Sequence, residues 1–188
     1  LHEVVPYLQA NFLFGVDDDA GDESIALTKD FMSRTPFVWP VVNTPHPFGG
    51  TPLFERLREG RLLTALPFSF YYSPYLATIP RHHSPLRYYE QLIELFEHFT
   101  TPRMLARRLR STSSPFVALI HTVRTLVKRR RLPMLRRLRD LLADDASFRT
   151  FHEGRSHTLP DLYHHQYERL LGRFAPLMTR EDRTPRLA

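Results

Sequence analysis

The sequence predicts an α/β segment that forms part of a (β/α) barrel, followed by an all-α extension. Residues 6–14 and 37–43 are apolar runs typical of parallel strands buried on both faces, and each run is followed by a turn and a helix start. From Ser84 onward, helix starts recur and no strand pattern is found. Strand, turn and helix in repeated order is the layout of a barrel whose chemistry lies in the loops after its strands. Two such units make a partial barrel.

The first unit begins with the strand that should end at Gly15, and Asp17–Asp19 should form the turn after it. Asp22 then stands where a side chain caps the N-terminus of a helix. That helix should span residues 22–34 and end before Pro36. Its apolar stripe consists of Ile25, Ala26, Phe31 and Met32.

The second unit contains Pro40 inside its strand. Proline cannot donate a hydrogen bond to a sheet ladder, so this strand should lie at an edge or contain a local irregularity. Residues 44–50 form a loop rich in proline and glycine. Thr51 and Pro52 are a favourable N-cap and first residue for a helix that runs to Arg58.

The remainder of the chain changes character twice. A stretch rich in Phe and Tyr and interrupted by prolines favours an ordered connector, because so many aromatic rings seek burial. Repeated Ser-Pro, Thr-Pro and Leu-Pro pairs then predict a series of helices. The sequence thus predicts four segments: β/α units at 1–60, an aromatic connector at 61–83, a helical extension at 84–178 and a flexible tail at 179–188.

Composition excludes several classes of protein. Hydrophobic residues make up 42% of the 188, which supports a folded core, and no apolar run reaches the roughly 18 residues that a membrane span needs. The chain has no cysteine, so disulfides, thiolate zinc sites and cysteine nucleophiles are excluded within it. No signal-peptide pattern is found, and a cytoplasmic location is the default.

The start of the chain predicts a piece of a longer protein. Leu1–Val5 reads as the end of a helix that runs straight into a strand. A two-strand parallel unit cannot bury both of its faces alone. We therefore expect the isolated piece to expose an apolar patch, formed by Phe12, Phe14, Val41 and Val42.

Positive charge is concentrated in one segment. The whole chain carries a net charge of +6, yet residues 101–140 hold 12 Arg or Lys and a single acid, Asp140, a local balance of +11. The rest of the chain has 14 bases and 19 acids, a balance of −5. The basic character therefore belongs to this helical segment alone.

A first motif lies at the end of the first strand, where Asn11, Leu13, Gly15 and Asp18 keep the register of a G-x-I-x-G-x-x-E pattern with substitutions. An apolar side chain such as Leu13 can lie flat against a purine, and Gly15 lets the backbone turn close to a ligand. Asp18 can accept a hydrogen bond from a ribose hydroxyl or cap the next helix. From the residues alone, a buried strand that ends in a Gly-Asp turn is the favoured interpretation, because a single G-x-x-D is a weak signal.

A second motif is the loop after the second strand. Residues 44–57 read T-P-H-P-F-G-G-T-P-L-F-E-R-L and match T-P-x-P-G-T-P-L-x-x-x-L with two extra residues in the loop. Together with the first motif, this order closely resembles the second half of the barrel of radical S-adenosylmethionine (SAM) enzymes, in particular of the type with a B12-binding domain. The resemblance covers residues 1 to about 110 well and the remainder only vaguely.

The resemblance implies roles for individual residues. Asn11, Leu13, Gly15 and Asp18 would contribute to the wall that contacts SAM, and Asn43, at the carboxyl end of the second strand, would reach the same ligand. His46 would face the substrate side, although a surface-loop histidine is an equally simple interpretation. The sequence identifies no catalytic residue.

The resemblance also implies an activity for an intact parent protein. Such a parent would bind SAM on a [4Fe–4S] cluster and cleave it reductively, and relatives that carry cobalamin add methyl transfer or cyclisation of a small or lipid-like substrate. The cluster cysteines of the family, C-x₃-C-x₂-C, follow the first barrel strand, upstream of the elements seen here. The chain would then be the C-terminal part of the parent, would lack the cluster-binding region, and should be inactive alone.

An alternative from another class is a non-enzymatic helical binding module. The apolar face and cationic end of residues 115–139 suit contact with an anionic membrane surface, which would make the protein peripheral at the membrane. Nucleic acid is less favoured because no aromatic residues alternate with the basic ones. A third interpretation is a helix packed on the barrel with a solvated basic end.

Histidines do not indicate a metal site. His82-His83 and His164-His165 are adjacent pairs, and neighbours on a helix point apart. No P-loop, G-x-G-x-x-G or nucleophile elbow is present. We therefore expect no metal ligands in this chain.

Overall fold

The computed structural model describes residues 5, 7–15, 22–181 and 183. By contacts the chain divides into two compact units, each built from two separate stretches: residues 1–45 with 80–140, and residues 46–79 with 141–188. This partition differs from the four successive segments that composition suggests, and those segments stay a prediction. Each unit is described by itself.

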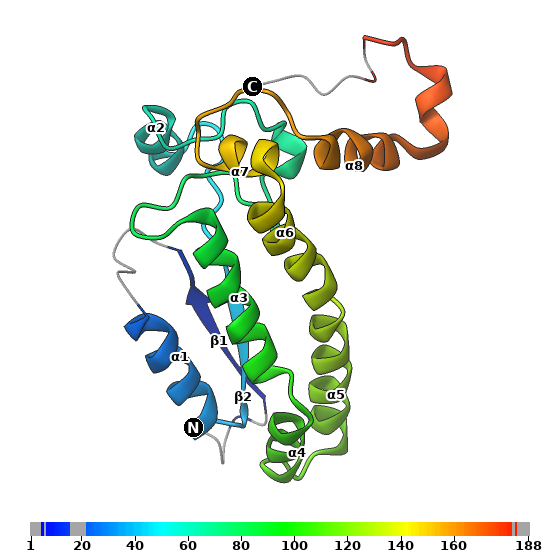
Figure 1. Cartoon of the computed structure of the whole chain (residues 1–188). Coiled ribbons are helices and arrows are strands. Elements are labelled where there is room, and N and C mark those ends of the chain that lie inside the picture. Colours follow the sequence, from blue (N-terminus) through cyan, green and yellow to red (C-terminus); the bar gives the residue numbers. More distant parts are fainter. Residues whose placement is uncertain (1–4, 6, 16–21, 182, 184–188) are drawn as a thin grey trace. The chain divides into compact units, whose positions relative to one another are not determined.

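The first unit contains a parallel pair of strands (Figure 1), β1 (Leu8–Leu13) and β2 (Val38–Asn43), joined through α1 (Glu23–Arg34). The register pairs Leu8 with Val38 and Leu13 with Asn43, and the Phe14 amide extends the ladder to the Asn43 carbonyl at 2.8 Å. The predicted strands and the helix between them are confirmed. Among the described residues the sheet has two strands, so each is an edge and Pro40 is compatible with β2. Two strands do not close a barrel, and the barrel stays a prediction.

One face of this sheet is covered by helices of the same chain. Phe12 contacts Phe31 of α1 at a ring separation of 5.5 Å, and Phe14 contacts Tyr88 of α3 (Pro85–Phe99) at 5.0 Å. Phe14 and Val42 are therefore buried. The expectation that these two side chains form an exposed patch is wrong, because α3 supplies the cover that a two-strand sheet lacks.

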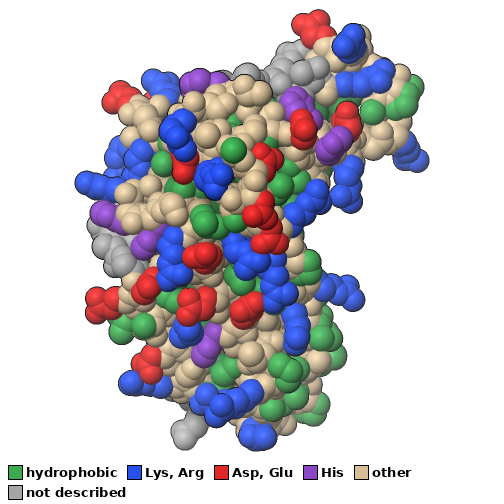
Figure 2. Space-filling model, in the orientation of Figure 1, with side chains coloured by type: hydrophobic (Ala, Val, Ile, Leu, Met, Phe, Trp, Pro, Cys, Tyr) green, Lys and Arg blue, Asp and Glu red, His purple; other side chains and the backbone are tan. Residues whose placement is uncertain are grey.

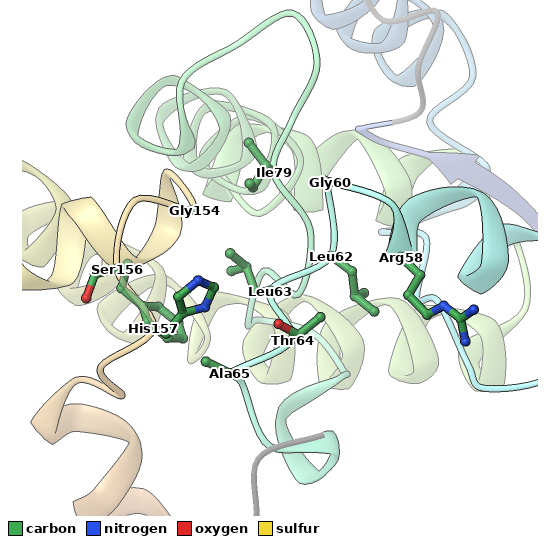
Figure 3. Close-up of a pocket in the computed structure, with 11 residues that line it drawn as sticks. Arg58, Gly60, Leu62, Leu63, Thr64, Ala65, Ile79, Gly154, Ser156 and His157 are labelled. Carbon is green, nitrogen blue, oxygen red and sulfur yellow. The ribbon is translucent and has the colours of Figure 1, made fainter.

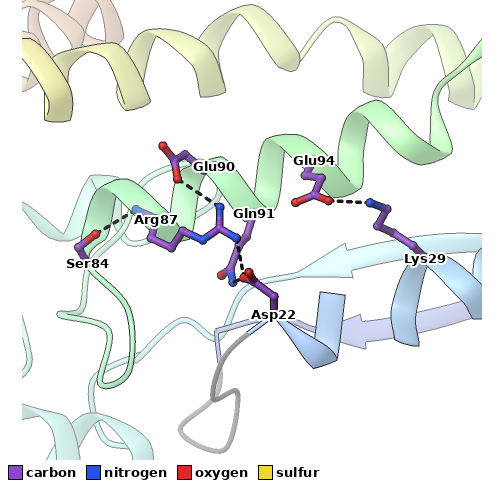
Figure 4. A network of polar contacts seen from close by, with 7 residues as sticks. All are labelled: Asp22, Lys29, Ser84, Arg87, Glu90, Gln91 and Glu94. Carbon is purple, nitrogen blue, oxygen red and sulfur yellow. Dashed lines mark hydrogen bonds and ion pairs between the residues drawn. The ribbon is translucent and has the colours of Figure 1, made fainter. Parts of the chain in front are cut away.

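Polar bridges join α1 to α3 (Figure 4). The Asp22 carboxylate accepts hydrogen bonds from Arg87 Nη2 at 2.5 Å and from Gln91 Nε2 at 2.8 Å, and these bonds lower its pKa. Lys29 Nζ lies 2.6 Å from Glu94 Oε1. Asp22 does occupy the N-cap position of α1, but its side chain makes no capping hydrogen bond. The predicted cap is wrong because two side chains of α3 bind this carboxylate instead.

The helices after residue 84 begin as the sequence predicts. The side chains of Ser84, Thr101 and Ser114 each accept a hydrogen bond from the backbone N–H three residues further on. A proline follows each of them, and its missing N–H costs nothing because the first N–H groups of a helix have no partner within the helix. Among the described residues beyond Ser84 there is no strand. The helices of this region in the first unit are α3, α4 (Pro102–Arg110), α5 (Pro115–Arg129) and the first part of α6 (Leu132–Asp144).

The second unit is built on an aromatic core. The predicted connector is ordered: Leu62 and Thr78 form an antiparallel bridge, and Phe70 is fully buried against Tyr163. The Tyr163 hydroxyl lies 2.8 Å from Nε2 of the buried His152. The regular elements of this unit, besides the end of α6, are α2 (Pro52–Arg58), α7 (Ala146–His152), α8 (Asp161–Leu171) and the 3-10 helices Phe68–Phe70 and Gly172–Leu177.

Gly15 generates a testable prediction. Its φ is +83°, and a Cβ at this position would lie 2.6 Å from Cε2 of Tyr88. Gly15→Ala should therefore destabilise the first unit by about 2 kcal/mol or more, from backbone strain and displacement of the ring. Urea unfolding followed by the fluorescence of Trp39, the single tryptophan, reports on this unit.

Gly49→Ala is the matched control, because a Cβ there meets nothing within 4 Å and the residue has no positive φ. Equal unfolding midpoints for the two variants would contradict the role assigned to Gly15.

Candidate functional site

The second face of the sheet remains open at the carboxyl ends of the strands. Residues paired across parallel strands point to the same face, so one face carries Gln9, Asn11 and Leu13 together with their partners on β2. Gln9, Asn11 and Asn43 are exposed, and 64% of Leu13 is exposed. Ligand sites of parallel α/β sheets form beyond the carboxyl ends of the strands.

Asn11, Leu13 and Asn43, three of the residues predicted to contact the ligand, lie together on this face. Leu13 and Asn43 are direct register partners, and Asn11 lies two residues before Leu13 on the same side. A cavity of about 250 Å³ lies beside this end of β1, toward the face that α1 and α3 cover; it is lined by Asn11, Phe12, Leu13 and Phe14 with Ser24 and Thr28 of α1 and Leu95 of α3. Asp18 lies outside the described residues. His46 belongs to the second unit.

Gly15 has a different environment from the one expected. We predicted that its missing side chain lets the backbone approach a ligand. The space beside its Cα is filled by the ring of Tyr88, so packing within the first unit explains the glycine. Gly15 is therefore a poor probe of ligand binding, because any substitution there first disturbs the fold.

His46 holds its loop in place. Its Nε2 accepts a hydrogen bond from the Ser73 amide at 3.2 Å, which requires that this nitrogen be unprotonated. Burial lowers the pKa of His46, in agreement with a neutral ring. The half-buried imidazole thus ties the loop after β2 to the aromatic connector.

Trp39 lies on the same face of the sheet as Leu13 and Asn43, in the part of that face that is buried. It is fully buried, with Phe99 in edge contact at 6.1 Å and the Arg108 guanidinium 5.0 Å from its ring centroid. Arg108 is also buried, and its Nη1 donates to the Phe99 carbonyl at 2.6 Å. Burial lowers the pKa of Arg108 to about 10. A cation thus lies under the aromatic ring in the interior of the first unit.

His121 completes this buried cluster. Its ring lies 6.0 Å from Trp39 and 5.6 Å from Tyr7. Burial, followed by the charges of Arg108 and Arg124, lowers the pKa of His121 to about 4. Both ring nitrogens of His121, Nε of Arg108 and Nε1 of Trp39 lack a hydrogen-bond partner in the part of the chain that the structure describes.

A second cavity of the first unit, about 350 Å³, opens beside Trp39. Arg124 Nη1 at this cavity donates to the Tyr7 hydroxyl at 2.5 Å and to Gln9 Oε1 at 2.8 Å. Sequence analysis missed this cavity, although His121, Arg124 and Lys128 recur at the three- and four-residue spacing of one helix face. Its walls are Gln9, Trp39, Val41, Arg124, Val127 and Lys128.

The second unit has a cavity of its own, of about 230 Å³ (Figure 3). Its walls are mainly apolar, with the His157 ring and Arg58 at opposite ends. Gly154 has a φ of +73°, which favours glycine, and a Cβ there would displace Cδ1 of Ile79. No carboxylate lines the cavity among the described residues.

The described residues contain no group of three or more His, Asp or Glu that could hold a metal ion, and the sequence has no cysteine. No helix among them is long and apolar enough to cross a membrane.

Comparison with known proteins gives one partial match. Bacteriochlorophyllide d C-12(1)-methyltransferase of Chlorobaculum tepidum is 37% identical over 59 residues, which are 31% of this chain and 13% of that enzyme. The aligned region is thus a small part of the relative. No protein-family model matches the chain, and no solved structure matches it.

The buried state of His121 predicts how stability depends on pH. Its folded-state pKa of about 4 lies below the ordinary value of 6.5, so the unfolded chain binds a proton first as the pH falls. The first unit should lose stability between pH 6.5 and about pH 4, by about 1.4 kcal/mol per pH unit from this residue.

His121→Phe keeps a ring between Tyr7 and Trp39 and removes the titration, so its unfolding midpoint should vary less over this range. His165→Phe, at an exposed position of α8, is the control and should follow the wild type. Parallel pH profiles for His121→Phe and the wild type in urea unfolding would contradict the assignment.

Proposed function

We propose that the open carboxyl end of the sheet forms part of the wall that contacts SAM in a radical SAM protein that transfers a methyl group. The observation that carries the proposal is the pairing of Leu13 with Asn43 on the open face, at the strand ends where the sequence resemblance puts the SAM wall. The partial match to a methyltransferase supports methyl transfer as the reaction class.

The side chains fit one wall of such a site. An exposed leucine offers a flat apolar surface to the adenine ring, and the exposed amide of Asn43 can both donate and accept hydrogen bonds. Asn11, which accepts a hydrogen bond from Gln9 at 3.2 Å, lies beside them as a second polar contact. Gly15 does not contribute, since Tyr88 occupies its open side.

The residues present do not fit an iron–sulfur cluster. Such clusters are held by cysteine thiolates, which this chain lacks, so we derive no step through the cluster. In the proposed parent the cluster would supply the electron that cleaves SAM, and its ligands would come from outside these 188 residues. No residue here is assigned to cobalamin. The proposal therefore concerns binding and orientation of the nucleoside only.

Nuclear magnetic resonance tests the wall directly on this chain. Titration of SAM into the ¹⁵N-labelled protein should shift the amide signals of Leu13 and Asn43 and leave those of α8 unchanged. One wall of a site gives little affinity, so saturation is expected at about millimolar ligand, a binding free energy of about −4 kcal/mol. Leu13→Asp should abolish the shifts, because a carboxylate replaces the apolar surface under the adenine.

Leu27→Asp in α1 is the matched control, since 62% of Leu27 is exposed compared with 64% of Leu13. It introduces the same charge at similar exposure and should bind SAM like the wild type. The proposal fails if SAM moves no signal at β1 and β2, or if both variants lose binding equally.

A second candidate function rests on the exposed face of α5. The apolar side chains follow a helical spacing along one face, and Figure 2 shows hydrophobic side chains at the lower right, over α5, with Lys and Arg around them. The exposed members of this face, called the α5 stripe below, are Phe116, Leu119, Val123, Leu126 and Val127.

Charge favours an anionic bilayer as the partner of the α5 stripe. Lys128, Arg129, Arg130 and Arg131 follow the stripe directly and form no ion pair with any described residue. An apolar face with a cationic border binds at the surface of membranes that carry anionic lipid. We propose this contact for residues 115–139.

Sedimentation with vesicles tests this contact. The protein should bind vesicles that contain about 30 mol% phosphatidylserine and release them as salt rises from about 50 to about 500 mM. Phe116→Ser combined with Leu119→Ser should remove most binding. Phe174→Ser combined with Leu177→Ser, also exposed positions, is the control. Undiminished binding of the α5 double variant, or binding to neutral vesicles alone, would exclude the stripe as the contact.

A further inference from the structure

Three cations lie at Trp39 or at the cavity beside it, and no acidic residue of the described chain pairs with them. Arg108 lies 5.0 Å and Arg124 5.9 Å from the Trp39 ring centroid, and Lys128 lines the same 350 Å³ cavity as Arg124. No Asp or Glu lines this cavity, and none of the three cations forms an ion pair within the described part of the chain. The cavity is therefore a concentration of positive charge.

This arrangement is costly for the folded chain as it stands. Arg108 is almost completely buried, and the charge of a buried cation is poorly compensated by a neutral carbonyl alone. The pKa of Lys128 is lowered by burial and then by the charges of Arg131 and Arg124. An anion bound in the cavity would reduce the repulsion between Lys128 and Arg124, which both line it.

Arg124 is fixed in position to receive such an anion. Its Nη1 is held by the Tyr7 hydroxyl and Gln9 Oε1, both of which are neutral, so the charge is oriented but not neutralised. A guanidinium presents its remaining N–H groups in a planar fork that matches carboxylate and phosphate oxygens. Lys128, one turn further along α5, adds a second donor to the same cavity.

The other walls suit an apolar group. Trp39 and Val41 of β2 and Val127 of α5 line the cavity, and Val127 also belongs to the exposed α5 stripe. An apolar body attached to the anion could thus leave the cavity along this stripe. A volume of about 350 Å³ holds a head group and a short apolar segment.

We propose that this cavity binds the carboxylate or phosphate group of an amphipathic anion, with Arg124 and Lys128 on the oxygens and Trp39, Val41 and Val127 against the apolar part. The site does not depend on the proposed methyl transfer. Its test needs neither SAM nor a cluster, so the two proposals succeed or fail separately.

Trp39 is the only tryptophan of the chain and reports on this cavity. Decyl phosphate and decanoate, added below the concentrations at which they form micelles, should each change Trp39 emission with saturation. Inorganic phosphate should bind more weakly, because it has no apolar part. Decyl maltoside, a neutral amphiphile with the same chain, should give no saturable change.

Variants locate the binding. Lys128→Gln and Arg124→Gln should each weaken decyl phosphate binding about tenfold, since each removes one charge-assisted contact. Arg137→Gln removes the same charge from an exposed position of α6 and should change affinity less than about twofold. Arg124→Gln also loses the bonds to Tyr7 and Gln9, so circular dichroism must show that it is folded. If it is not folded, Lys128→Gln decides, because no hydrogen bond of the Lys128 side chain is found among the described residues.

A second experiment, with vesicles, distinguishes a free anionic ligand from a lipid head group. Saturable binding of monomeric decyl phosphate that Lys128→Gln weakens supports a free anionic ligand. A Trp39 change seen only with vesicles of about 30 mol% phosphatidic acid, and reduced in the same variant, supports a lipid head group. The proposal is overturned if neither probe changes Trp39 emission, if decyl maltoside acts equally, or if Lys128→Gln and Arg137→Gln bind like the wild type.

Discussion

A pair of parallel strands has two faces to cover and too few residues to cover either, and the first unit is organised by this constraint. α1 and α3 close one face through Phe12 and Phe14, and the Asp22 bridges join these two helices. The other face is buried only around Trp39, where α3, α4 and α5 converge. The carboxyl ends of the strands stay open, and both proposed ligand sites of the first unit lie on this incompletely covered face.

The cover around Trp39 differs from an ordinary apolar core. The ring is surrounded by Phe99 on one side and by Arg108, His121 and Arg124 on others. Cation–π contact compensates part of the cost of burying a guanidinium, by about 1–2 kcal/mol. It does not satisfy the polar atoms of Arg108 and His121 that lack partners in the described region. Arg124 contacts the Trp39 ring and also lines the neighbouring cavity, so its charge contributes to the positive potential there.

Local sequence signals predicted the elements well and their side-chain partners poorly. The two strands, α1 and the proline-initiated helices follow from short-range patterns, in which a cap or a turn acts within a few residues. Asp22, Gly15 and Trp39 could not be interpreted in this way. Asp22 binds residues 65 and 69 positions further along, and Gly15 is fixed by Tyr88. The open face with Leu13 and Asn43 could be predicted because side chains alternate between the two faces along paired strands. The cation-lined cavity could not, because it depends on α5, which begins more than 70 residues after the end of β2.

The interleaved construction of the two units affects the order in which the chain can fold during synthesis. Both strands and α1 are made by residue 43, but α3, which covers their apolar face, begins at Pro85 and is separated from them by the first stretch of the second unit. A nascent chain thus carries a sheet that α1 alone covers through the synthesis of some 40 further residues, about two to eight seconds at ordinary rates of translation. Phe14 and Val42, buried in the finished protein, are the side chains that a chaperone would meet during this interval.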